Sequence, residues 1–388
     1  MKKRKVLFIT PSLCHGGLEQ FQISMLQALD PEKFDSTLFY YIEEDALLPL
    51  VPDYVKVVRD KDDNHYFRDI KAFFYMMLVK GASVIKQKRF ADKYSKILAS
   101  YIHEKKMKHP AKDIFYQDVF DVVVANAAGK PMEIALHMKA EKRFVFFHSS
   151  VDLHHELHAQ LFPMFDGIVA VSGGVKEMLQ KTYPHVKEKV LLLENYVDAE
   201  SILNKADERE AFVDRETFNI SSCGRLSSEK GFDLAVEAAA ILQKKGYQFR
   251  WYFIGDGPER DKIESLIKKH ELGEKIHITG FTYNPFPMIK ESQLYVQPSY
   301  EESYGRTIKE AQILGCPVVS TDTVGGRTLI KQEETGILTE ISPEALAEGI
   351  ELFLKNQSLL DKYKNQHSLE MNKKEKQIFQ KKLEDLLS

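Results

Sequence analysis

The alternation of short apolar runs with amphipathic stretches is the feature that most constrains how this chain folds. The first run, at 6–10, leads through a glycine-containing loop to Leu18, Phe21, Met25 and Leu29, which recur at helical spacing. Continuous apolar strands separated by helices indicate a parallel sheet that is covered on both faces. Further apolar runs follow in the first half of the chain, at 38–42, 122–125, 143–147, 168–171 and 190–193.

The pattern pauses in the charged stretch 199–217 and then restarts, so the chain is predicted to hold two domains. Residues 1–198 form the first Rossmann-like, doubly wound α/β domain, 199–217 the linker and 218–372 the second such domain. Residues 373–388 form a polar helix that is expected to pack back on the first domain. In this class a ligand binds outside the carboxyl ends of the strands, here in a central cleft that the two domains face. The second domain's strands are expected at 218–223, 250–254, 276–279, 294–297 and 317–321, and its helices near 231–244, 258–270 and 305–314.

Composition excludes several other classes of protein. The net charge of -3 gives no reason to expect a nucleic-acid binder. Cys14, Cys223 and Cys316 lie far apart and show neither a disulfide framework nor metal-ligand spacing. The longest apolar run, at 73–79, is far below the ~20 residues that span a bilayer. We therefore expect the protein to be cytoplasmic, or peripheral on the inner face of a membrane.

Two features of the first domain lie in loops that follow predicted strands. Gly16 and Gly17 allow close approach of a ligand, and the helix after them points its positive N-terminus toward the cleft. A tight turn between strand and helix explains the two glycines equally well. His148 ends the strand at 143–147. It is either a donor or acid–base group aimed into the cleft, or a structural histidine with satisfied hydrogen bonds.

In the second domain two more loops follow strands. Arg225 and Lys230 lie at 224–231, directly before a helix, and two fixed cations at a helix N-terminus suit a pyrophosphate. The position of the loop favours that role over two solvated surface cations. Gly255 lies in a G-x-G at 253–260 that lacks a third glycine. A dinucleotide site is therefore only weakly indicated, and a turn explains the glycines equally well.

Two glutamates eight positions apart, Glu302 and Glu310, follow another predicted strand. Glu302 lies in the loop, and Gly305 permits close approach near the helix start. Glu310 falls about two helical turns later, with its side chain directed back toward that start. Both carboxylates can reach one elongated ligand, and the free amides of Ser303, Tyr304 and Gly305 can bind its hydroxyls or phosphates. The alternative is a helix-capping acid beside a solvated helix face.

These residues together resemble the retaining GT-B glycosyltransferases, specifically glycosyltransferase family four (glycosyl transferases group 1). That family carries E-x7-E followed by E-A-x-x-x-G-x-P-V-V and a later glycine. Here the pattern begins at Glu302 and Glu310 and continues to Gly325. The loops at 224–231 and 253–260 stand in the family's order, and the resemblance is weak only between about 45 and 120. The fold that it implies is GT-B, with two Rossmann-like domains facing a central cleft.

By that resemblance the protein is a metal-independent hexosyltransferase without a cofactor, and its substrate is a nucleotide diphosphate sugar, with UDP favoured. Arg225 and Lys230 would hold the diphosphate and stabilise charge on the leaving group. Glu310 would bind the ribose. Glu302 and the amides of 303–305 would hold the donor hexose, as a positioning group rather than a covalent nucleophile.

The remaining residues that the resemblance brings to the donor come from both domains. His148 would contact the donor sugar and is counted, with Glu302, Arg225 and Lys230, among the catalytic residues. Gly16, Gly17 and Gly255 would approach the donor closely, and Phe281 would lie by the base.

The acceptor implied by the family is a glycan or a lipid-linked sugar, in bacterial surface or capsular polysaccharide biosynthesis. Residues 68–112 hold twelve Lys or Arg and three Asp or Glu around an apolar run. Such a segment either docks on an anionic membrane surface or forms a packed helical pair with a solvated basic side. Ser303 departs from the family, which commonly has glycine there, so donor choice can differ.

Two alternatives to a transferase remain. One is a sugar-nucleotide epimerase on the same fold, and the other is a non-catalytic sugar-nucleotide-binding partner subunit. A glycosidase is disfavoured because the helix offset sends Glu302 and Glu310 to different places, whereas a retaining glycosidase needs carboxyls about 5–5.5 Å apart. The missing third glycine disfavours a nicotinamide dehydrogenase.

Overall fold

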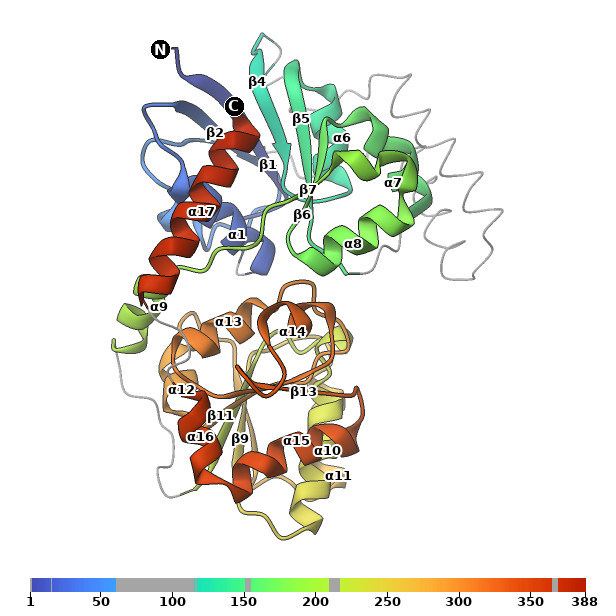
Figure 1. The fold of residues 1–388 in the computed structure, drawn as a ribbon, viewed down its shortest axis with the longest axis vertical. Coiled ribbons are helices and arrows are strands. Elements are labelled where there is room, and N and C mark those ends of the chain that lie inside the picture. The colour runs from blue at the N-terminus through green and yellow to red at the C-terminus, as the bar shows by residue number, and fades with distance from the viewer. Residues whose placement is uncertain are drawn as a thin grey trace. The chain divides into compact units, whose positions relative to one another are not determined.

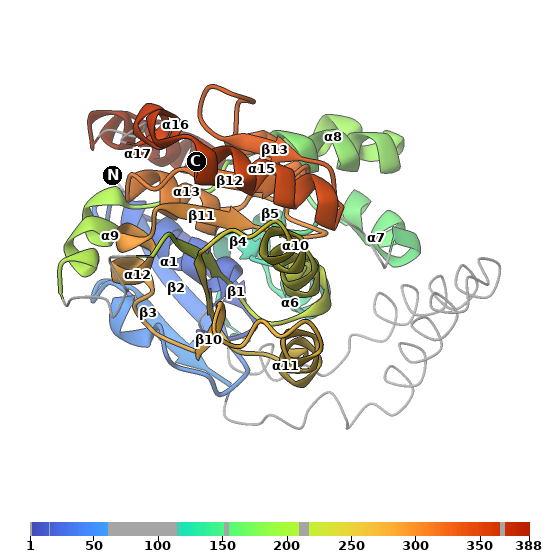
Figure 2. The ribbon, with the colours of Figure 1, turned by 90° about the horizontal axis from the view of Figure 1, so that it is seen from below.

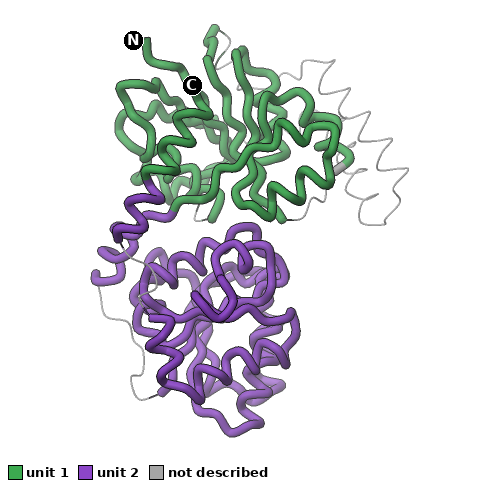
Figure 3. The backbone as a smooth tube through the Cα atoms, viewed as in Figure 1, with its two compact units in different colours: residues 1–196, 377–388 green, residues 197–376 purple. Residues whose placement is uncertain are grey.

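The computed structural model describes residues 2–14, 16–60, 115, 117–150, 155–208, 217–364 and 369–388, and the chain divides into two compact units (Figures 1 and 3). Unit 1 comprises Met1–Tyr196 and Gln377–Ser388, and unit 2 comprises Val197–Lys376. The basic segment 68–112 lies outside the described residues. None of the helices that are described is both long and apolar enough to cross a membrane.

Unit 1 is built on a parallel sheet in which the described strands number seven. Consecutive residues of its first strand, such as Leu7 and Phe8, point to opposite faces, and both are fully buried. Helices therefore cover both faces of this sheet, as expected for a parallel one. The strands are β1 (Arg4–Thr10), β2 (Phe34–Tyr40), β3 (Lys56–Arg59), β4 (Phe120–Ala125), β5 (Ala140–Phe147), β6 (Gly167–Ala170) and β7 (Val190–Leu192). The helices are α1 (Gly17–Ala28), α6 (Lys130–His137), α7 (His155–Leu161) and α8 (Gly173–Thr182), with short 3-10 turns at Leu48–Leu50, Phe162–Met164 and Pro184–Lys189.

The strand order of unit 1 is β3-β2-β1-β4-β5-β6-β7. After β1 the next strands of the sequence, β2 and β3, are added toward one edge of the sheet. The strands from β4 to β7 are added toward the other edge. This makes the boundary between β1 and β4 the topological switch point, where open α/β sheets bind ligands.

Unit 2 is built on a second parallel sheet with the order β10-β9-β8-β11-β12-β13. One apolar cluster packs Trp251 and Phe253 under α10 and α15, and another packs Tyr252 and Ile254 under α9 and α12. Figure 2 shows these helices on the two sides of the strands. The strands are β8 (Asn219–Cys223), β9 (Arg250–Ile254), β10 (Ile276–Gly280), β11 (Leu294–Gln297), β12 (Val318–Thr321) and β13 (Ile337–Thr339). The helices are α9 (Ala199–Ala206), α10 (Phe232–Lys244), α11 (Arg260–Lys269), α12 (Phe286–Glu291), α13 (Arg306–Ile313), α14 (Val324–Leu329), α15 (Pro343–Lys355) and α16 (Gln357–Tyr363), with a 3-10 turn η4 at Ser228–Lys230. The two doubly wound parallel sheets confirm the α/β class predicted from the sequence.

The stretch 199–217, predicted as a linker, begins with a packed helix of unit 2. The carboxylate of Asp198 caps α9 by accepting a hydrogen bond from the backbone N–H of Ser201 at 3.1 Å. Ala199, Ile202 and Ala206 share one face of α9 and are buried in the core of unit 2. Three small or branched apolar residues in a charged stretch were too weak a signal to reveal this helix. The boundary between the units therefore lies before the predicted linker, at 196/197.

The final helix, α17 (Leu369–Leu387), begins in unit 2 and ends in unit 1 (Figure 3). In unit 2 the carboxamide of Asn372 donates to the carbonyl of Val197 at 2.7 Å and accepts from the N–H of Ala199 at 3.1 Å. In unit 1 the ring of Phe379 lies 5.7 Å from that of Tyr196, between centroids, and Phe379 is buried in the core beside α1. The helix starts four residues before the predicted 373–388.

Candidate functional site

The most highly connected group of predicted site residues lies in unit 2, at the switch point of its sheet. Chain order reverses between β8 and β11, so the loops that follow these strands meet at the same edge of the sheet. Backbone hydrogen bonds tie the loop after β8 to both of its neighbours. The N–H of Leu226 donates to the carbonyl of Asp256 at 3.0 Å, and the N–H of Tyr300 donates to the carbonyl of Glu229 at 2.9 Å. Three loops that are far apart in the sequence thus form one rigid surface.

Two glycines make this close approach of the loops possible. Gly231 has φ +64°, and a Cβ atom there would lie 2.1 Å from the carbonyl oxygen of Pro298. A Cβ atom on Gly255 would lie 1.9 Å from the carbonyl oxygen of Gly224. Gly255 was predicted from the sequence to approach the donor. The structure gives a more immediate reason for a glycine there, because the backbone of Gly224 occupies the space of a side chain.

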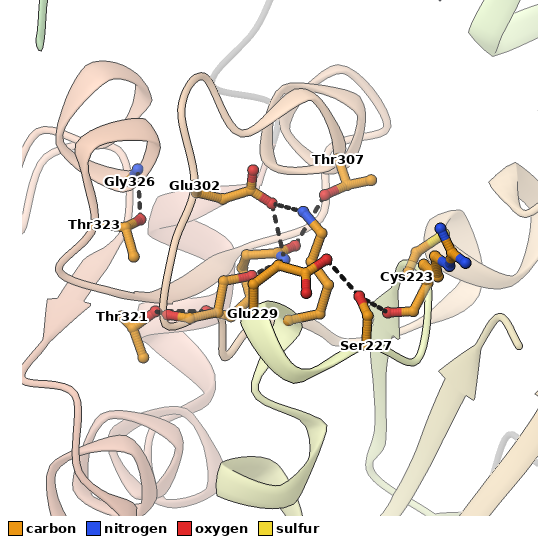
Figure 4. Close-up of polar contacts among 12 residues, drawn as sticks. Cys223, Ser227, Glu229, Glu302, Thr307, Thr321, Thr323 and Gly326 are labelled. Atoms are coloured by element: carbon orange, nitrogen blue, oxygen red, sulfur yellow. Dashed lines mark hydrogen bonds and ion pairs between the residues drawn. The ribbon is translucent and has the colours of Figure 1, made fainter. Parts of the chain in front are cut away.

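Lys230 and Glu302 face each other across the joined loops, and Figure 4 labels Glu302 at this contact. Their Nζ and Oε1 atoms are 2.6 Å apart, and the side chains are 25% and 12% exposed. The carbonyl of Glu302 also accepts a hydrogen bond from the N–H of Gly325 at 2.7 Å, which fixes the backbone of its loop. Arg225, on the same loop as Lys230, is exposed. The sequence pointed to all three side chains, and the structure brings Lys230 and Glu302 into direct contact.

The second glutamate of the pair has a different environment. Glu310 lies inside α13 and is buried, and its Oε1 atom is 3.0 Å from Nε of Arg306. Burial raises the pKa of the Glu310 carboxyl, and the charge of Arg306 opposes that rise. Arg306 was not singled out in the sequence, although its i,i+4 spacing from Glu310 predicts such a pair.

The turn into α13 contains the other predicted residues of this loop. Gly305 has φ +84°, which favours glycine, and it directly precedes the first residue of α13. Ser303 lies beside it in the loop and is partly buried. Tyr304, predicted as a donor-binding residue through its amide, has its side chain in the core that lies under α13. That side chain therefore stabilises the turn.

Phe281 follows β10 at the same edge of the sheet. Its side chain is 54% exposed, and its ring centroid lies 5.0 Å from that of Tyr283 in an edge-to-face arrangement. An exposed aromatic pair beyond the carboxyl end of a strand offers a flat apolar surface to a planar ligand.

In unit 1 the predicted residues lie at or next to the switch point between β1 and β4. Gly16 is the N-cap of α1, and Gly17 is the first residue of that helix and is exposed. Asn126, directly after β4, donates from Nδ2 to the carbonyl of Leu18 at 3.3 Å and so connects α1 to the sheet. Asn126 was missed in the sequence because an asparagine after a strand resembles an ordinary turn residue.

His148 lies beyond β5 with its ring against two aromatic side chains. Its centroid is 5.4 Å from that of Phe21 and 6.4 Å from that of Phe146. Burial lowers the pKa of His148 to about 4, although a hydrogen bond with the backbone of Asn126 opposes this shift. Nε2 is buried and has no hydrogen-bond partner among the described residues. His148 is therefore neutral at neutral pH, with one ring nitrogen left for another partner.

Replacing His148 by glutamine is expected to make the protein less sensitive to acid. The pKa is about 4 in the folded state and 6.5 is its ordinary value, so the unfolded chain takes up a proton first as the pH falls. Between these two pH values the wild type should lose up to about 1.4 kcal/mol of stability per pH unit through this residue. Urea unfolding followed by circular dichroism at about pH 7 and pH 5 measures the difference.

His185→Gln is the matched control for this prediction, because His185 is exposed in unit 1. The control should keep the acid sensitivity of the wild type. An equal acid sensitivity of His148→Gln and wild type would contradict the lowered pKa of His148.

No three His, Cys, Asp or Glu side chains come together as a metal site within the described part of the chain. The arrangement does present positive charge, from the held Lys230 and the exposed Arg225, beside the N-terminus of α10. Such an arrangement can hold an anion of the size of a diphosphate.

Comparison with known proteins finds a family match in the second unit. Residues 204–374 match the family model described as "Glycosyl transferases group 1". The chain is 31% identical over 207 residues to an N-acetylgalactosamine-N,N'-diacetylbacillosaminyl-diphospho-undecaprenol 4-alpha-N-acetylgalactosaminyltransferase of Campylobacter jejuni, a match covering 53% of this chain and 55% of that protein. It is 32% identical over 176 residues to an alpha-D-kanosaminyltransferase of Streptomyces kanamyceticus, covering 44% and 45%. The chain thus spans about half the length of these curated relatives.

Solved structures resemble the whole chain. Anabaena Alr3699/HepE in complex with UDP and glucose superposes with a TM-score of 0.72 at 16% identity, covering 99% of both chains. Sucrose-phosphate synthase from Thermosynechococcus elongatus gives a TM-score of 0.71 at 14% identity, covering 99% of this chain and 98% of the other. At such low identity these likenesses show the fold alone. As the resemblance drawn from the motifs implied, residues 204–374 match the glycosyl transferases group 1 model, and the chain has the GT-B fold.

Proposed function

We propose that this protein is a retaining, metal-independent hexosyltransferase that uses a nucleotide diphosphate sugar, with UDP as the favoured nucleotide. The observation that carries the proposal is the contact of Lys230 with Glu302 where the loops after β8 and β11 join. It supplies a fixed cation for a diphosphate and, next to it, a carboxylate for sugar hydroxyls. The group 1 domain and the likeness to HepE, whose structure contains UDP and glucose, support this choice.

In the proposed reaction the bond between the anomeric carbon and the diphosphate oxygen breaks. An acceptor hydroxyl forms the new bond on the face that the diphosphate leaves, and its proton passes to a diphosphate oxygen. Lys230 and Arg225 would stabilise the charge that grows on the leaving group, which is the largest electrostatic contribution in such a step. These cations and the helix N-termini would do here what a metal ion does in other transferases.

The other residues would position the donor. Glu302 would accept hydrogen bonds from hexose hydroxyls, and Glu310 would bind the ribose. Phe281 would stack near the base, and Gly16 and Gly17 would approach the phosphates. His148, being neutral, would exchange a hydrogen bond with a sugar hydroxyl through Nε2 rather than supply a positive charge.

For the acceptor we propose a glycan or a lipid-linked sugar, in the synthesis of a bacterial surface polysaccharide or glycoconjugate. The Campylobacter relative is named for a diphospho-undecaprenol-linked acceptor, which supports a lipid-linked one. Such an acceptor would place the protein at the inner face of a membrane, with 68–112 as the contacting segment. Flotation with anionic vesicles tests this contact, and the absence of binding would remove segment 68–112 from the proposal.

A nucleotide panel tests the donor class. The melting temperature of the wild type should rise with UDP and UDP-sugars more than with GDP, ADP or their sugars, because a ligand that binds only the folded state stabilises it. A ligand at 100 times its Kd adds about 2.7 kcal/mol. The rise should disappear in Lys230→Ala and persist in Lys262→Ala, an exposed lysine of the same unit that pairs with Asp233.

Hydrolysis of the same donor separates an enzyme from a non-catalytic partner subunit. Slow release of free nucleotide without acceptor indicates a transferase, whereas binding without any turnover, with or without acceptors, indicates a sensor. No thermal shift with any nucleotide would contradict the proposed donor site.

A further inference from the structure

A buried glutamine at the end of β11 lies directly under the contact of Lys230 with Glu302. Gln297 is 3% exposed, and its carboxamide takes part in four hydrogen bonds. Oε1 accepts from the hydroxyls of Tyr295 at 2.7 Å and Thr307 at 2.8 Å. Nε2 donates to Oγ of Ser299 at 2.8 Å and to Oε1 of Glu302 at 3.5 Å. This set satisfies both ends of a buried amide.

The orientation of the carboxamide follows from its partners. The hydroxyls of Tyr295 and Thr307 can donate or accept, whereas the carboxylate of Glu302 can only accept, so the NH2 group of the amide faces Glu302 and its carbonyl oxygen faces the two hydroxyls. A flipped amide would set its NH2 group against Tyr295 and Thr307, and its oxygen against the carboxylate of Glu302. Figure 4 labels Glu302 and Thr307, and its dashed lines mark the hydrogen bonds in which they take part.

The network is anchored in the rigid parts of unit 2. Tyr295 is fully buried, and its hydroxyl accepts from the backbone N–H of Cys223 at 3.3 Å, at the end of β8. Thr307 lies in the first turn of α13, and the carbonyl of Ser299 accepts from the hydroxyl of Thr321 at the end of β12. The carboxamide of Gln297 is therefore tied to β8 and β12, the strands on either side of β11, and to α13, the helix that carries Glu310.

Among the described residues, the carboxylate of Glu302 contacts two side chains, and the two contacts differ in strength. The charged contact with Lys230 at 2.6 Å is the stronger, and the contact with Gln297 at 3.5 Å is long for a hydrogen bond. When Lys230 is drawn toward a diphosphate, its hold on Glu302 weakens. The carboxamide of Gln297 is then the fixed donor that remains for the carboxylate.

From this geometry we infer that Gln297 is a positioning residue, which keeps Glu302 aimed at the donor sugar once Lys230 engages the diphosphate. The inference rests on the proposed function. Gln297 is buried beneath Glu302, so no contact between Gln297 and the substrate is proposed. Its effect should therefore be transmitted through Glu302 and should depend on the presence of that carboxylate.

A double-mutant cycle tests this dependence. Gln297→Met keeps the approximate length of the side chain and removes its hydrogen bonds. It is expected to weaken the binding of UDP-glucose about tenfold, the usual size of a lost hydrogen bond to a charged group. In the Glu302→Gln background the same change should weaken binding less than about twofold, because the group through which it acts is already altered. Isothermal titration with UDP and UDP-glucose provides the four dissociation constants for each ligand.

Gln312→Met is the matched control, since Gln312 of α13 also donates its amide to a carbonyl, that of Leu329 at 3.1 Å. It should leave the dissociation constant for UDP-glucose unchanged even where it lowers the melting temperature. If Gln297→Met does not fold, Thr307→Val replaces it. That variant removes one of the two hydroxyls that orient the amide and should weaken UDP-glucose binding about threefold, again only when Glu302 is present.

The outcomes separate the inference from the function on which it rests. Failure of the wild type to bind either UDP or UDP-glucose would overturn the proposed donor. Normal binding by the wild type, with equal losses from Gln297→Met in both backgrounds or with no loss at all, would overturn the positioning role alone. An equal loss for UDP and UDP-glucose would also overturn it, because Glu302 is assigned to the sugar.

Discussion

Lys230→Ala is expected to lower kcat/KM for the donor by about a thousandfold, the usual cost of removing one fixed charge or donor from a developing anion. The side chain is only 25% exposed and is held by Glu302 at 2.6 Å, so it is positioned before the donor arrives. Its loss also leaves the carboxylate of Glu302 without its cation, next to the position proposed for the diphosphate. Initial rates of nucleotide release with varied donor measure the change.

The matched control is Lys262→Ala, which removes the same charge from an exposed position of unit 2. It should lower kcat/KM less than about twofold, since exposed ion pairs contribute little. Equal losses in the two variants would mean that net charge, rather than the position of Lys230, governs the reaction.

Gly231→Ala is expected to destabilise unit 2 by about 3–5 kcal/mol, at the upper end of what single substitutions do. Its left-handed φ of +64° costs about 1–2 kcal/mol with a side chain. The rest arises because the new Cβ atom would lie 2.1 Å from the carbonyl oxygen of Pro298, which is backbone and cannot turn away. Trp251, the single tryptophan of the chain, is fully buried in unit 2, so its fluorescence during urea unfolding reports this unit alone.

Gly246→Ala separates the two causes. Gly246 has φ +85°, and a Cβ atom there would meet nothing within 4 Å. It should therefore incur only the backbone cost of about 1–2 kcal/mol. A loss at Gly231 no larger than the loss at Gly246 would mean that the loops after β8 and β11 can separate freely.

The sequence revealed those parts of the fold that carry a strong local pattern. Apolar runs such as 6–10 and 294–297 correspond to β1 and β11, which are buried on both faces. The edge strand β3 and the strand β13 were missed because each holds only two adjacent apolar residues, Val57 and Val58 in β3 and Ile337 and Leu338 in β13. The helix within 199–206 was missed because its apolar residues are also few, and its stability comes from the core that it covers.

The candidate site shows the same division between local pattern and tertiary contact. Lys230 and Glu302 stood out because each follows an apolar strand, but their contact spans 72 positions and follows only from the adjacency of β8 and β11. Gln297 did not stand out, because a glutamine at a strand end reads as an exposed residue until its surroundings are known. Sequence patterns therefore reveal the residues that face a ligand more readily than the buried residues that hold those side chains in position.

The path of α17 has a consequence for how the protein is made. Phe379, Leu383 and Leu387 complete a core whose other members come from residues 6–196. During synthesis on the ribosome the first unit therefore cannot close that core until Leu387 has been added. Unit 2 possesses all of its own residues once Lys376 has been added. Domains generally fold in the order of their synthesis. Here unit 1 is begun before unit 2 but can be completed only after it.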